Sequence, residues 1–312
     1  MRVLVTGGAG FIGSHIVDNL VRRGHKVRVL DDLSSGTTAN ISGHLKEGVV
    51  DFVKGNVKDS KTTKDALKGI DSVFHLAAIV SVPFSMKNPS ATRAVNVDGT
   101  ANVLELCTGT SASRFVLVSS CAVYGESEYL PIDEAHPTNP ISPYASSKLD
   151  GERQCRIYEK KGKLDAVILR LFNVYGPRQR GGDYSGVIAN FLEKAKKDLP
   201  LTIYGDGSQL RDFVYVQDIA DAASAALEAD SAKNEIFNIA YGKSVSINEL
   251  AESVLNVSGK NLDILHEAPR PGDIKRSVAD ISKARRMLKY TPKFPLEKGL
   301  KSLLELQSEK HK

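Results

Sequence analysis

A strand, a glycine-rich turn and a helix at the start of the chain constrain its fold more than any other feature. Apolar residues 3–5 precede Gly7, Gly10 and Gly13, which have the spacing G-x-x-G-x-x-G, and an amphipathic stretch follows them. Such a turn brings the backbone close to a pyrophosphate, and the helix after it offers its N-terminal N–H groups to the anion. The sequence therefore predicts a dinucleotide site at this turn.

The second predicted strand, residues 26–31, ends at Asp31. A carboxylate there is placed to accept hydrogen bonds from the adenosine ribose, and it would repel a 2′-phosphate. This predicts NAD rather than NADP as the cofactor. The same glycine spacing also occurs in tight turns of other α/β proteins, but the position of the acid disfavours that interpretation.

Strand and helix patterns alternate up to residue 173. The predicted strands cover residues 3–5, 26–31, 49–57, 71–78, 114–120 and 164–173. One predicted helix follows the glycine turn, and others cover 60–69, 89–108 and 143–161. This alternation predicts an α/β fold with a doubly wound parallel sheet, the Rossmann arrangement. Residues near the carboxyl ends of its strands would then contact the cofactor. These are Asp31, Asp32, Ser34, Ser35, Gly36, Asn56, Val57, Leu76, Ala77 and Ala78.

The pattern changes after residue 173. A loop rich in Gly, Arg and Pro covers 174–186, helices are predicted at 187–198 and 246–257, and strands at 201–207 and 235–240. Residues 213–229 are predicted to form a strand that leads into a helix. Ser246 and Glu249 have the spacing of a capping box. We predict an NAD-binding domain over residues 1–173 and a smaller α/β substrate lobe over 174–312. We also expect chain crossings between the two lobes, and a frayed end over residues 306–312.

The composition is that of an ordinary globular protein. The chain has 312 residues, 41% of them hydrophobic, and a net charge of +5, which does not indicate a nucleic-acid partner. No apolar stretch approaches membrane-spanning length, and the first strand leaves no room for a signal peptide. Cys107, Cys121 and Cys155 lack metal-site spacing, so we expect no metal, reduced thiols and a cytoplasmic protein. We expect packing roles for Cys121 and a structural role for His75.

Tyr144 and Lys148 form the pattern Y-x-x-x-K inside a predicted helix, so both side chains lie on one helix face. An ammonium beside a phenol favours the phenolate, and a tyrosine with a lowered pKa can act as a general base. Ser120 ends the fifth strand at the sheet edge where ligands bind. Alone, the pair also describes a surface tyrosine beside a solvated lysine, but its combination with the glycine turn, Asp31 and Ser120 predicts an active site.

Several motifs together resemble the extended short-chain dehydrogenase/reductase superfamily, and within it the UDP-hexose 4-epimerases. They are TGGAGFIGSH, HLAA, SSCAVYG, YASSK, RLFNVYGPRQ, GDGSQLRDFVYVQD and RPGDI, and they span the chain to about Tyr290. The resemblance implies that Ser120, Tyr144 and Lys148 are the catalytic residues.

The resemblance also implies binding roles at matched positions. NAD contacts, besides the glycines and the catalytic residues, fall on Phe11, Ile12, Asp31, Asp32, Val57, Leu76, Ala77, Asn96 and Phe172. Contacts with the UDP-sugar, besides Ser120 and Tyr144, fall on Asn173, Val187, Tyr204, Arg211, Arg270, Asp273 and Ser277. Arginines suit a diphosphate because they are forked, permanently charged donors. The chain departs from the family pattern at Asn56, where an Asp is usual, and at Cys121, where smaller residues are usual.

The implied reaction interconverts the C4 epimers of a UDP-hexose through a transient 4-keto sugar, with hydride passing to NAD and back. In relatives restricted to glucose and galactose, the position of Ser277 often holds a tyrosine. A serine leaves room for an N-acetyl group, so we expect UDP-N-acetylglucosamine and UDP-N-acetylgalactosamine to be accepted as well. A neighbouring loop could instead fill that space.

Other activities of the same superfamily stay open. A nucleotide-sugar dehydratase or a UDP-glucuronate decarboxylase expects acidic residues after the strand-end hydroxyl, where this chain has Cys121 and Ala122. A sugar reductase usually uses NADPH, which Asp31 opposes. A non-catalytic nucleotide-sugar-binding protein could share the fold, because fold does not fix function. By resemblance, the helices at 89–108 and 143–161 would form a homodimer interface.

Overall fold

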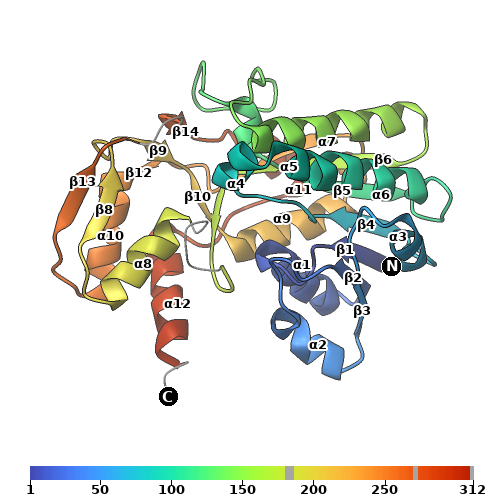
Figure 1. Ribbon diagram of the computed structural model, residues 1–312, viewed down its shortest axis with the longest axis horizontal. Coiled ribbons are helices and arrows are strands. Elements are labelled where there is room, and N and C mark those ends of the chain that lie inside the picture. Colours follow the sequence, from blue (N-terminus) through green and yellow to red (C-terminus); the bar gives the residue numbers. More distant parts are fainter. Residues whose placement is uncertain (180–185, 270–272, 310–312) are drawn as a thin grey trace.

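The computed structural model describes residues 1–179, 186–269 and 273–309. A seven-stranded sheet dominates the first lobe, in the order β11-β6-β5-β4-β1-β2-β3 (Figure 1). All of its neighbouring strands are parallel, which confirms the predicted doubly wound α/β fold. The strands are β1 (Arg2–Thr6), β2 (Lys26–Asp31), β3 (Val50–Lys54), β4 (Ser72–His75), β5 (Arg114–Ser120), β6 (Asp165–Leu171) and β11 (Ile236–Ile239).

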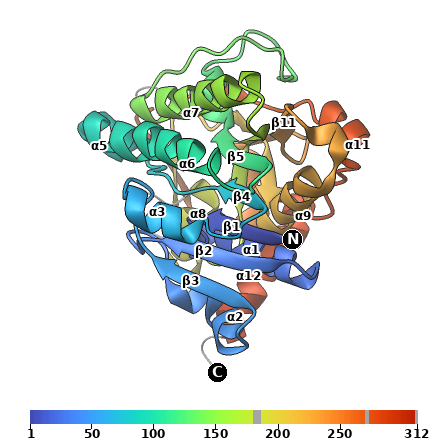
Figure 2. The same cartoon turned by 90° about the vertical axis from the view of Figure 1, so that its right-hand side faces the viewer.

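Helices cover both faces of this sheet (Figure 2). On one face lie α3 (Ser60–Ala66), α5 (Pro89–Arg93), α6 (Gly99–Cys107) and α7 (Pro143–Lys160), and on the other α1 (Phe11–Arg22), α9 (Val216–Glu228) and α11 (Ser282–Leu288). Each face has its own apolar core: Ile16 and Leu20 of α1 belong to one, and Leu104 of α6 to the other. Burial of these faces supplies the main force that holds the layers together.

The helix predicted over 89–108 is continuous but irregular. Between α5 and α6 the chain forms a π-helical turn, Ala94–Asp98, and α4 (Val82–Lys87) precedes α5. Short helices that the sequence did not indicate, Thr38–Ile41 and α2 (Ser42–Lys46), follow β2 within or just after the predicted loop. Strands β3 and β4 end earlier than expected, so residues 55–57 and 76–78 are loops at the sheet edge.

The second lobe consists of small sheets and three helices. Strand β8 (Leu201–Tyr204) pairs with β13 (Ile264–Glu267), and β9 (Leu210–Arg211) lies between β12 (Val245–Ser246) and β14 (Arg276–Ser277). Strand β7 (Asn173–Tyr175) pairs with β10 (Phe213–Tyr215). Helices α8 (Val187–Lys196), α10 (Ile247–Ser258) and α12 (Leu296–Glu309) pack around a third core. The predicted capping box at Ser246 and Glu249 begins α10.

The chain crosses between the lobes more than once. After residue 173 it builds β7 to β10 and then returns through α9 to β11, which pairs with β6 in the large sheet. Residues 216–239 therefore belong to the first lobe, although they lie beyond the proposed boundary at residue 173.

Residues 306–309, which belong to the segment predicted to be frayed, continue α12, and residues 310–312 lie outside the described residues. Earlier in this helix, Leu300 and Leu303 are buried against the second lobe. No helix in the described ranges is long and apolar enough to cross a bilayer.

Candidate active site

The glycine turn between β1 and α1 is closed by backbone contacts that leave no room for side chains. Gly7 has φ +71°, and a Cβ there would lie 2.9 Å from the backbone nitrogen of Ala77. A Cβ at Gly13 would lie 2.2 Å from the carbonyl oxygen of Gly7. Both positions therefore require glycine, because backbone on the facing side cannot move away as a flexible side chain could.

The N-terminus of α1 is open toward this turn. Its N-cap is Gly10, whose missing side chain cannot accept a hydrogen bond from the helix, and its first turn contains no acidic residue. Phe11 and Ile12 begin the helix and are half-buried. A twelve-residue helix with uncapped N–H groups fits the pyrophosphate of a dinucleotide.

Two adjacent carboxylates lie on the adenosine side of the turn. Asp31 is buried and accepts hydrogen bonds from the backbone N–H groups of Ala9 (3.0 Å) and Leu33 (2.8 Å), which tie β2 to the glycine turn. Burial raises the pKa of Asp31 above its ordinary value. Asp32 accepts from the Ser34 N–H (2.9 Å) and from the side chain of Asn56 (2.7 Å). Although burial opposes them, these bonds lower the pKa of Asp32.

Asn56, the residue that departs from the family pattern, therefore binds Asp32 in this structure. Ser34 and Ser35 are exposed beside this pair, whereas Gly36 is buried and faces Ala9. Asp32, Asn56 and the two serines thus lie together just after the ends of β2 and β3. Val57 is buried next to them, where its side chain faces Gly99.

The loop after β4 follows the glycine turn. Thr6 accepts hydrogen bonds from the N–H groups of Leu76 and Ala77, which hold this loop, including Ala78, beside β1. His75 bridges Thr6 (2.8 Å) and Thr100 (2.9 Å) through its two ring nitrogens. Burial lowers the pKa of His75 to about 3, so the ring is neutral and structural, as expected.

Asn96, predicted to contact NAD, occupies the π-helical turn and is buried. Its side-chain oxygen accepts from the Ile79 N–H (2.7 Å), and its amide nitrogen donates to the Ile79 carbonyl and to Ser147 (both 2.9 Å). These bonds fix the loop after β4 to α7. Phe172, another predicted cofactor residue, is buried at the end of β6, where its backbone joins β11.

The three predicted catalytic residues meet at the carboxyl end of β5. Ser120 is the last residue of β5, and its hydroxyl lies close enough to the Tyr144 phenol to lower the pKa of that phenol. Tyr144 lies in the first turn of α7, where its N–H donates to Ser85 of α4 (3.1 Å). One turn later, the buried Lys148 ammonium donates to the carbonyl oxygen of Val118 (2.8 Å).

The small sheet of the second lobe brings the predicted substrate residues toward this point. Ser277 of β14 is opposite Arg211 of β9, and the Arg211 guanidinium forms an ion pair with Asp273 (2.6 Å). Ser277 is buried, and its hydroxyl lies near the Cys121 thiol, which directly follows Ser120. The predicted substrate residue Ser277 therefore lies close to Ser120, the predicted catalytic serine.

The remaining substrate residues occupy element ends. Asn173 begins β7, and its side-chain oxygen is buried without a hydrogen-bond partner in the described residues. Such an orphaned acceptor has to be satisfied by a ligand or water. Val187 begins α8, Tyr204 ends β8, and both are half-buried. Arg270 lies outside the described residues.

The comparison with protein families decides the assignment. The model of the "NAD dependent epimerase/dehydratase family" matches residues 3–240. The chain belongs to this family. It is an NAD-dependent enzyme, and the glycine turn, the open end of α1 and Asp31 are the features that would hold the NAD.

Relatives and solved structures match along the whole chain. The UDP-glucose 4-epimerase of Mycolicibacterium smegmatis is 37% identical over 307 residues, 98% of each chain. The structure of the UDP-glucose 4-epimerase of Thermotoga maritima with UDP-glucose is 34% identical, with a TM-score of 0.95 and full coverage of both chains. The structure of the UDP-N-acetylglucosamine 4-epimerase of Methanobrevibacter ruminantium, with UDP-N-acetylmuramic acid, is 37% identical. Its TM-score is 0.94, and 99% of this chain and 98% of that chain are covered.

The prediction that the pKa of Tyr144 is lowered by Lys148 is wrong for the protein without a bound cofactor. Lys148 was expected to lower the pKa of the Tyr144 phenol, but burial raises that pKa to about 12, against the lowering effect of the Ser120 hydrogen bond. Burial likewise lowers the pKa of Lys148 to about 8. Both shifts have the same cause, since a buried site disfavours each group's charged form. The Lys148 ammonium is bonded to the Val118 carbonyl.

Sequence reasoning missed two buried carboxylates. Asp212 accepts hydrogen bonds from the backbone N–H groups of Tyr241 (2.9 Å), Gly242 (3.0 Å) and Ala279 (3.2 Å), and so joins β9 to the segment that carries Ser277. Glu152 lies one turn after Lys148 on α7, paired with Arg170 of β6. The signals were present, since Asp212 follows Arg211 directly and Glu152 extends the four-residue spacing of Tyr144 and Lys148.

The three cysteines are free thiols. Burial raises the pKa of Cys121 to about 11, while its hydrogen bond with Ser277 opposes the shift. A neutral thiol is a weak nucleophile and packs as a small apolar group. Among the described residues, no three His, Cys, Asp or Glu side chains gather in a way that could hold a metal ion.

Proposed function

We propose that the protein is a UDP-hexose 4-epimerase that interconverts UDP-glucose with UDP-galactose and UDP-N-acetylglucosamine with UDP-N-acetylgalactosamine. The observation that carries this proposal is the meeting of Ser120, Tyr144 and Lys148 with Cys121 and Ser277 at the sheet edge. The 4-epimerases named above, which align along the full chain, support it.

In the proposed reaction, Tyr144 accepts the proton of the sugar 4-hydroxyl and Ser120 bridges the two oxygens. Lys148 stabilises the phenolate that forms, since its positive charge lies one helical turn away. When bound, NAD would supply the hydride acceptor for C4 and the donor for its return. The 4-keto sugar turns while its diphosphate stays held, and when C4 is reduced on its opposite face Tyr144 returns the proton to the 4-oxygen, which restores the hydroxyl and the phenol. Arg211 and Arg270 are the proposed diphosphate anchors.

The same site disfavours dehydration and decarboxylation. Both activities expect carboxyl groups at positions 121 and 122, and this chain has a thiol whose pKa is about 11 and an alanine without an ionisable group. Neither side chain can exchange protons near neutral pH. The hydrogen bonds of Asp31 to Ala9 and Leu33 fix its carboxylate beside the turn, where it would repel the 2′-phosphate of NADP and so disfavours a reductase.

Acceptance of N-acetyl sugars rests on the position of Ser277. Its side chain is small, and its contact is the Cys121 thiol, also small. Because Cys121 directly follows Ser120, we propose that the pair borders a pocket for a C2 substituent in both epimers. We also propose, by resemblance, a homodimer through α5–α6 and α7, which pack against each other, and a cytoplasmic location.

A substrate panel tests the proposal. Purified protein is incubated without added NAD with UDP-glucose, UDP-N-acetylglucosamine and UDP-glucuronic acid, and the C4 epimers are separated by chromatography. We expect epimers of the first two, and none with Tyr144→Phe as the control. A 4-keto-6-deoxy product would instead identify a dehydratase, and binding of all three sugars without turnover would identify a non-catalytic protein.

A further inference from the structure

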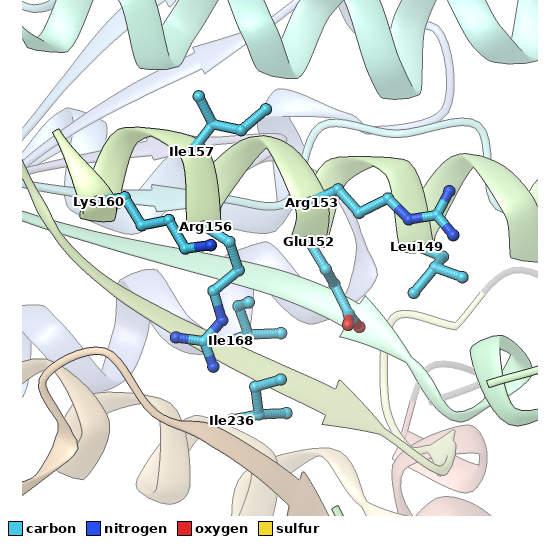
Figure 3. A pocket seen from close by; sticks show the side chains of 8 residues that line it. All are labelled: Leu149, Glu152, Arg153, Arg156, Ile157, Lys160, Ile168 and Ile236. Carbon is cyan, nitrogen blue, oxygen red and sulfur yellow. The ribbon is translucent and has the colours of Figure 1, made fainter. Parts of the chain in front are cut away.

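A third ionisable residue continues the catalytic face of α7. Tyr144, Lys148 and Glu152 follow one another at intervals of four residues, so they line one side of the helix. Glu152 is only 3% exposed. Figure 3 shows its carboxylate pointing from α7 toward the strands of the sheet, whereas Ile157 points away from them. A buried charge at this position requires partners.

Within the described part of the chain, the Glu152 carboxylate has three hydrogen bonds, all to residues of the sheet. Its carboxylate pairs with Arg170 of β6 through two guanidinium nitrogens (2.6 and 3.0 Å) and accepts from the Ser119 hydroxyl of β5 (2.5 Å). The side chains of Glu152 and Arg170 are 4% and 5% exposed. The forked pair fixes the carboxylate in orientation as well as in position.

Lys148 and Glu152 are connected through adjacent residues at the end of β5. Lys148 donates to the carbonyl oxygen of Val118, and the next residue, Ser119, donates to Glu152. The catalytic Ser120 follows directly. Helix α7 is thus attached to β5 at the two residues that directly precede Ser120.

The charges around Lys148 give Glu152 a second effect. Burial lowers the pKa of Lys148, and the charge that raises it is the Glu152 carboxylate. Of the other groups that face this region, His75 on β4 is neutral, and Cys121 and Tyr124 after β5 have raised pKa values. Arg170 on β6 is a cation, held by Glu152 itself and lying over the Tyr124 ring (4.7 Å).

A purely stabilising role explains this arrangement poorly. Burying an ion pair costs several kcal/mol of hydration per ion, and apolar residues of equal volume often give equal or greater stability. The pair is instead placed where it orders the backbone next to Ser120 and places a negative charge one turn from Lys148. We propose that Glu152 is a positioning residue that keeps the Lys148 ammonium charged and aligned beside Tyr144. The inference rests on the proposed function, in which that charge stabilises the phenolate.

The test compares three variants with the wild-type protein. Glu152→Gln removes the charge but keeps an acceptor for Ser119. Glu152→Gln alone leaves the buried Arg170 cation without its partner, which could unfold the protein. The double variant Glu152→Gln with Arg170→Gln removes both charges, so we expect it to keep the fold. Glu159→Gln is the matched control, because Glu159 pairs with Arg156 on the same helix, two turns further on.

The first readout is independent of turnover. The pH dependence of Lys148 acylation by acetic anhydride, followed by mass spectrometry of the Lys148 peptide, gives the titration midpoint of this amine. We expect the midpoint to fall by about 1 pH unit in both Glu152 variants, the usual size for losing a nearby opposite charge. The control should keep the wild-type midpoint. An unchanged midpoint in the folded double variant overturns the proposal.

The second readout is the pH profile of epimerisation. Since Lys148 must be charged, kcat in the Glu152 variants should be lost at lower pH than in wild type. That change amounts to about a fivefold loss near pH 8, about a tenfold loss above pH 9 and near-normal kcat below pH 7, with KM for the UDP-sugar unchanged. A uniform loss at every pH would assign Glu152 to the fold alone and overturn the proposal. If the midpoint shifts but the wild-type protein converts no sugar, the positioning contact stands and the proposed function fails.

Discussion

The cofactor side and the substrate side of the site are built in different ways. On the cofactor side, β1, the glycine turn and α1 are contiguous, and backbone hydrogen bonds such as Gly10 to Gly7 hold the turn. On the substrate side, Ser277 and Arg211 come from strands 66 residues apart in the sequence and meet Cys121 from a third segment. One side is a local backbone structure, whereas the other is an assembly of side chains.

This difference indicates where substitutions should affect the fold and NAD binding, and where they should affect the choice of sugar. Side chains added to the cofactor turn collide with backbone, so they disturb the fold and NAD binding together. Side chains added at Ser277 meet other side chains, so they change which sugar fits. Asp212 connects the scattered substrate segments through three backbone N–H groups. The catalytic residues lie between the two sides and should have the largest effects.

Tyr144→Phe should therefore have the largest effect of all. It removes the proton acceptor and leaves the NAD-binding turn intact, so kcat should fall by about 10²–10⁴-fold while bound NAD is retained. Steady-state epimerisation and the NAD content of the purified variant check this. Near-normal turnover would show that another group takes the proton.

The local construction of the cofactor side explains why the sequence predicted it well. Glycine spacing, flanking strand and helix, and Asp31 all lie within 30 residues, so their pattern reports their geometry directly. The seven-stranded sheet followed from the same alternation, except that β11 returns from beyond residue 173. Tertiary packing of α12 was missed, because Leu300 and Leu303 gain burial only from segments distant in sequence.

The substrate side was predictable only through resemblance. Nothing within ten residues of Ser277 indicates that it faces Cys121, and nothing near Glu152 indicates Arg170 of β6. The pKa of Tyr144 was also out of reach, since it depends on burial at the junction of α7, α4 and β5 rather than on the spacing to Lys148. A local pattern of residue types does not predict burial by segments that are distant in the sequence.

Gly13→Ala tests the rigidity of the cofactor side. The added Cβ would lie 2.2 Å from the Gly7 carbonyl oxygen and 2.9 Å from the Gly8 Cα, so the turn and α1 must separate. We expect a loss of about 3 kcal/mol in the free energy of unfolding, at the upper end for overpacking, and loss of bound NAD. Urea unfolding and NAD binding measure the two effects.

Gly43→Ala is the matched control for that variant. A Cβ at Gly43 meets nothing within 4 Å, and Gly43 lies in the helix α2. The free energy of unfolding should rise by about 0.4–1 kcal/mol, since the unfolded chain loses freedom. If Gly13→Ala were as mild as this control, the turn would be adaptable and the contrast between the two sides would fail.

Ser277→Tyr tests the substrate side and should have a smaller, selective effect. The phenol would take the space beside Cys121, so turnover of UDP-N-acetylglucosamine should fall at least about tenfold relative to UDP-glucose. The ratio of kcat/KM for the two sugars measures this and serves as its own internal control. Ser277→Ala should leave the ratio near the wild-type value. Equal losses for both sugars would place the size limit elsewhere.

The smallest expected effect concerns a buried histidine on the cofactor side. His75 has a pKa of about 3 in the folded protein, well below its ordinary value of 6.5, because burial between Thr6 and Thr100 disfavours the charged ring. Below pH 6.5 the unfolded chain therefore binds a proton that the folded chain excludes. The free energy of unfolding should fall as the pH drops from 6.5 toward 3, by at most about 1.4 kcal/mol per pH unit from this group.

His75→Gln removes this titration while keeping a donor and an acceptor for the two threonines. Its free energy of unfolding should depend less on pH between 6 and 4 than that of wild type, whatever its value at pH 7. His266→Gln, at an exposed site of the second lobe, is the control and should keep the wild-type slope. Urea unfolding at several pH values measures the slopes. Equal slopes for wild type and His75→Gln would mean that the His75 ring is charged or solvated in the folded protein. Water would then reach the end of β4 despite the hydrogen bonds of His75 to Thr6 and Thr100.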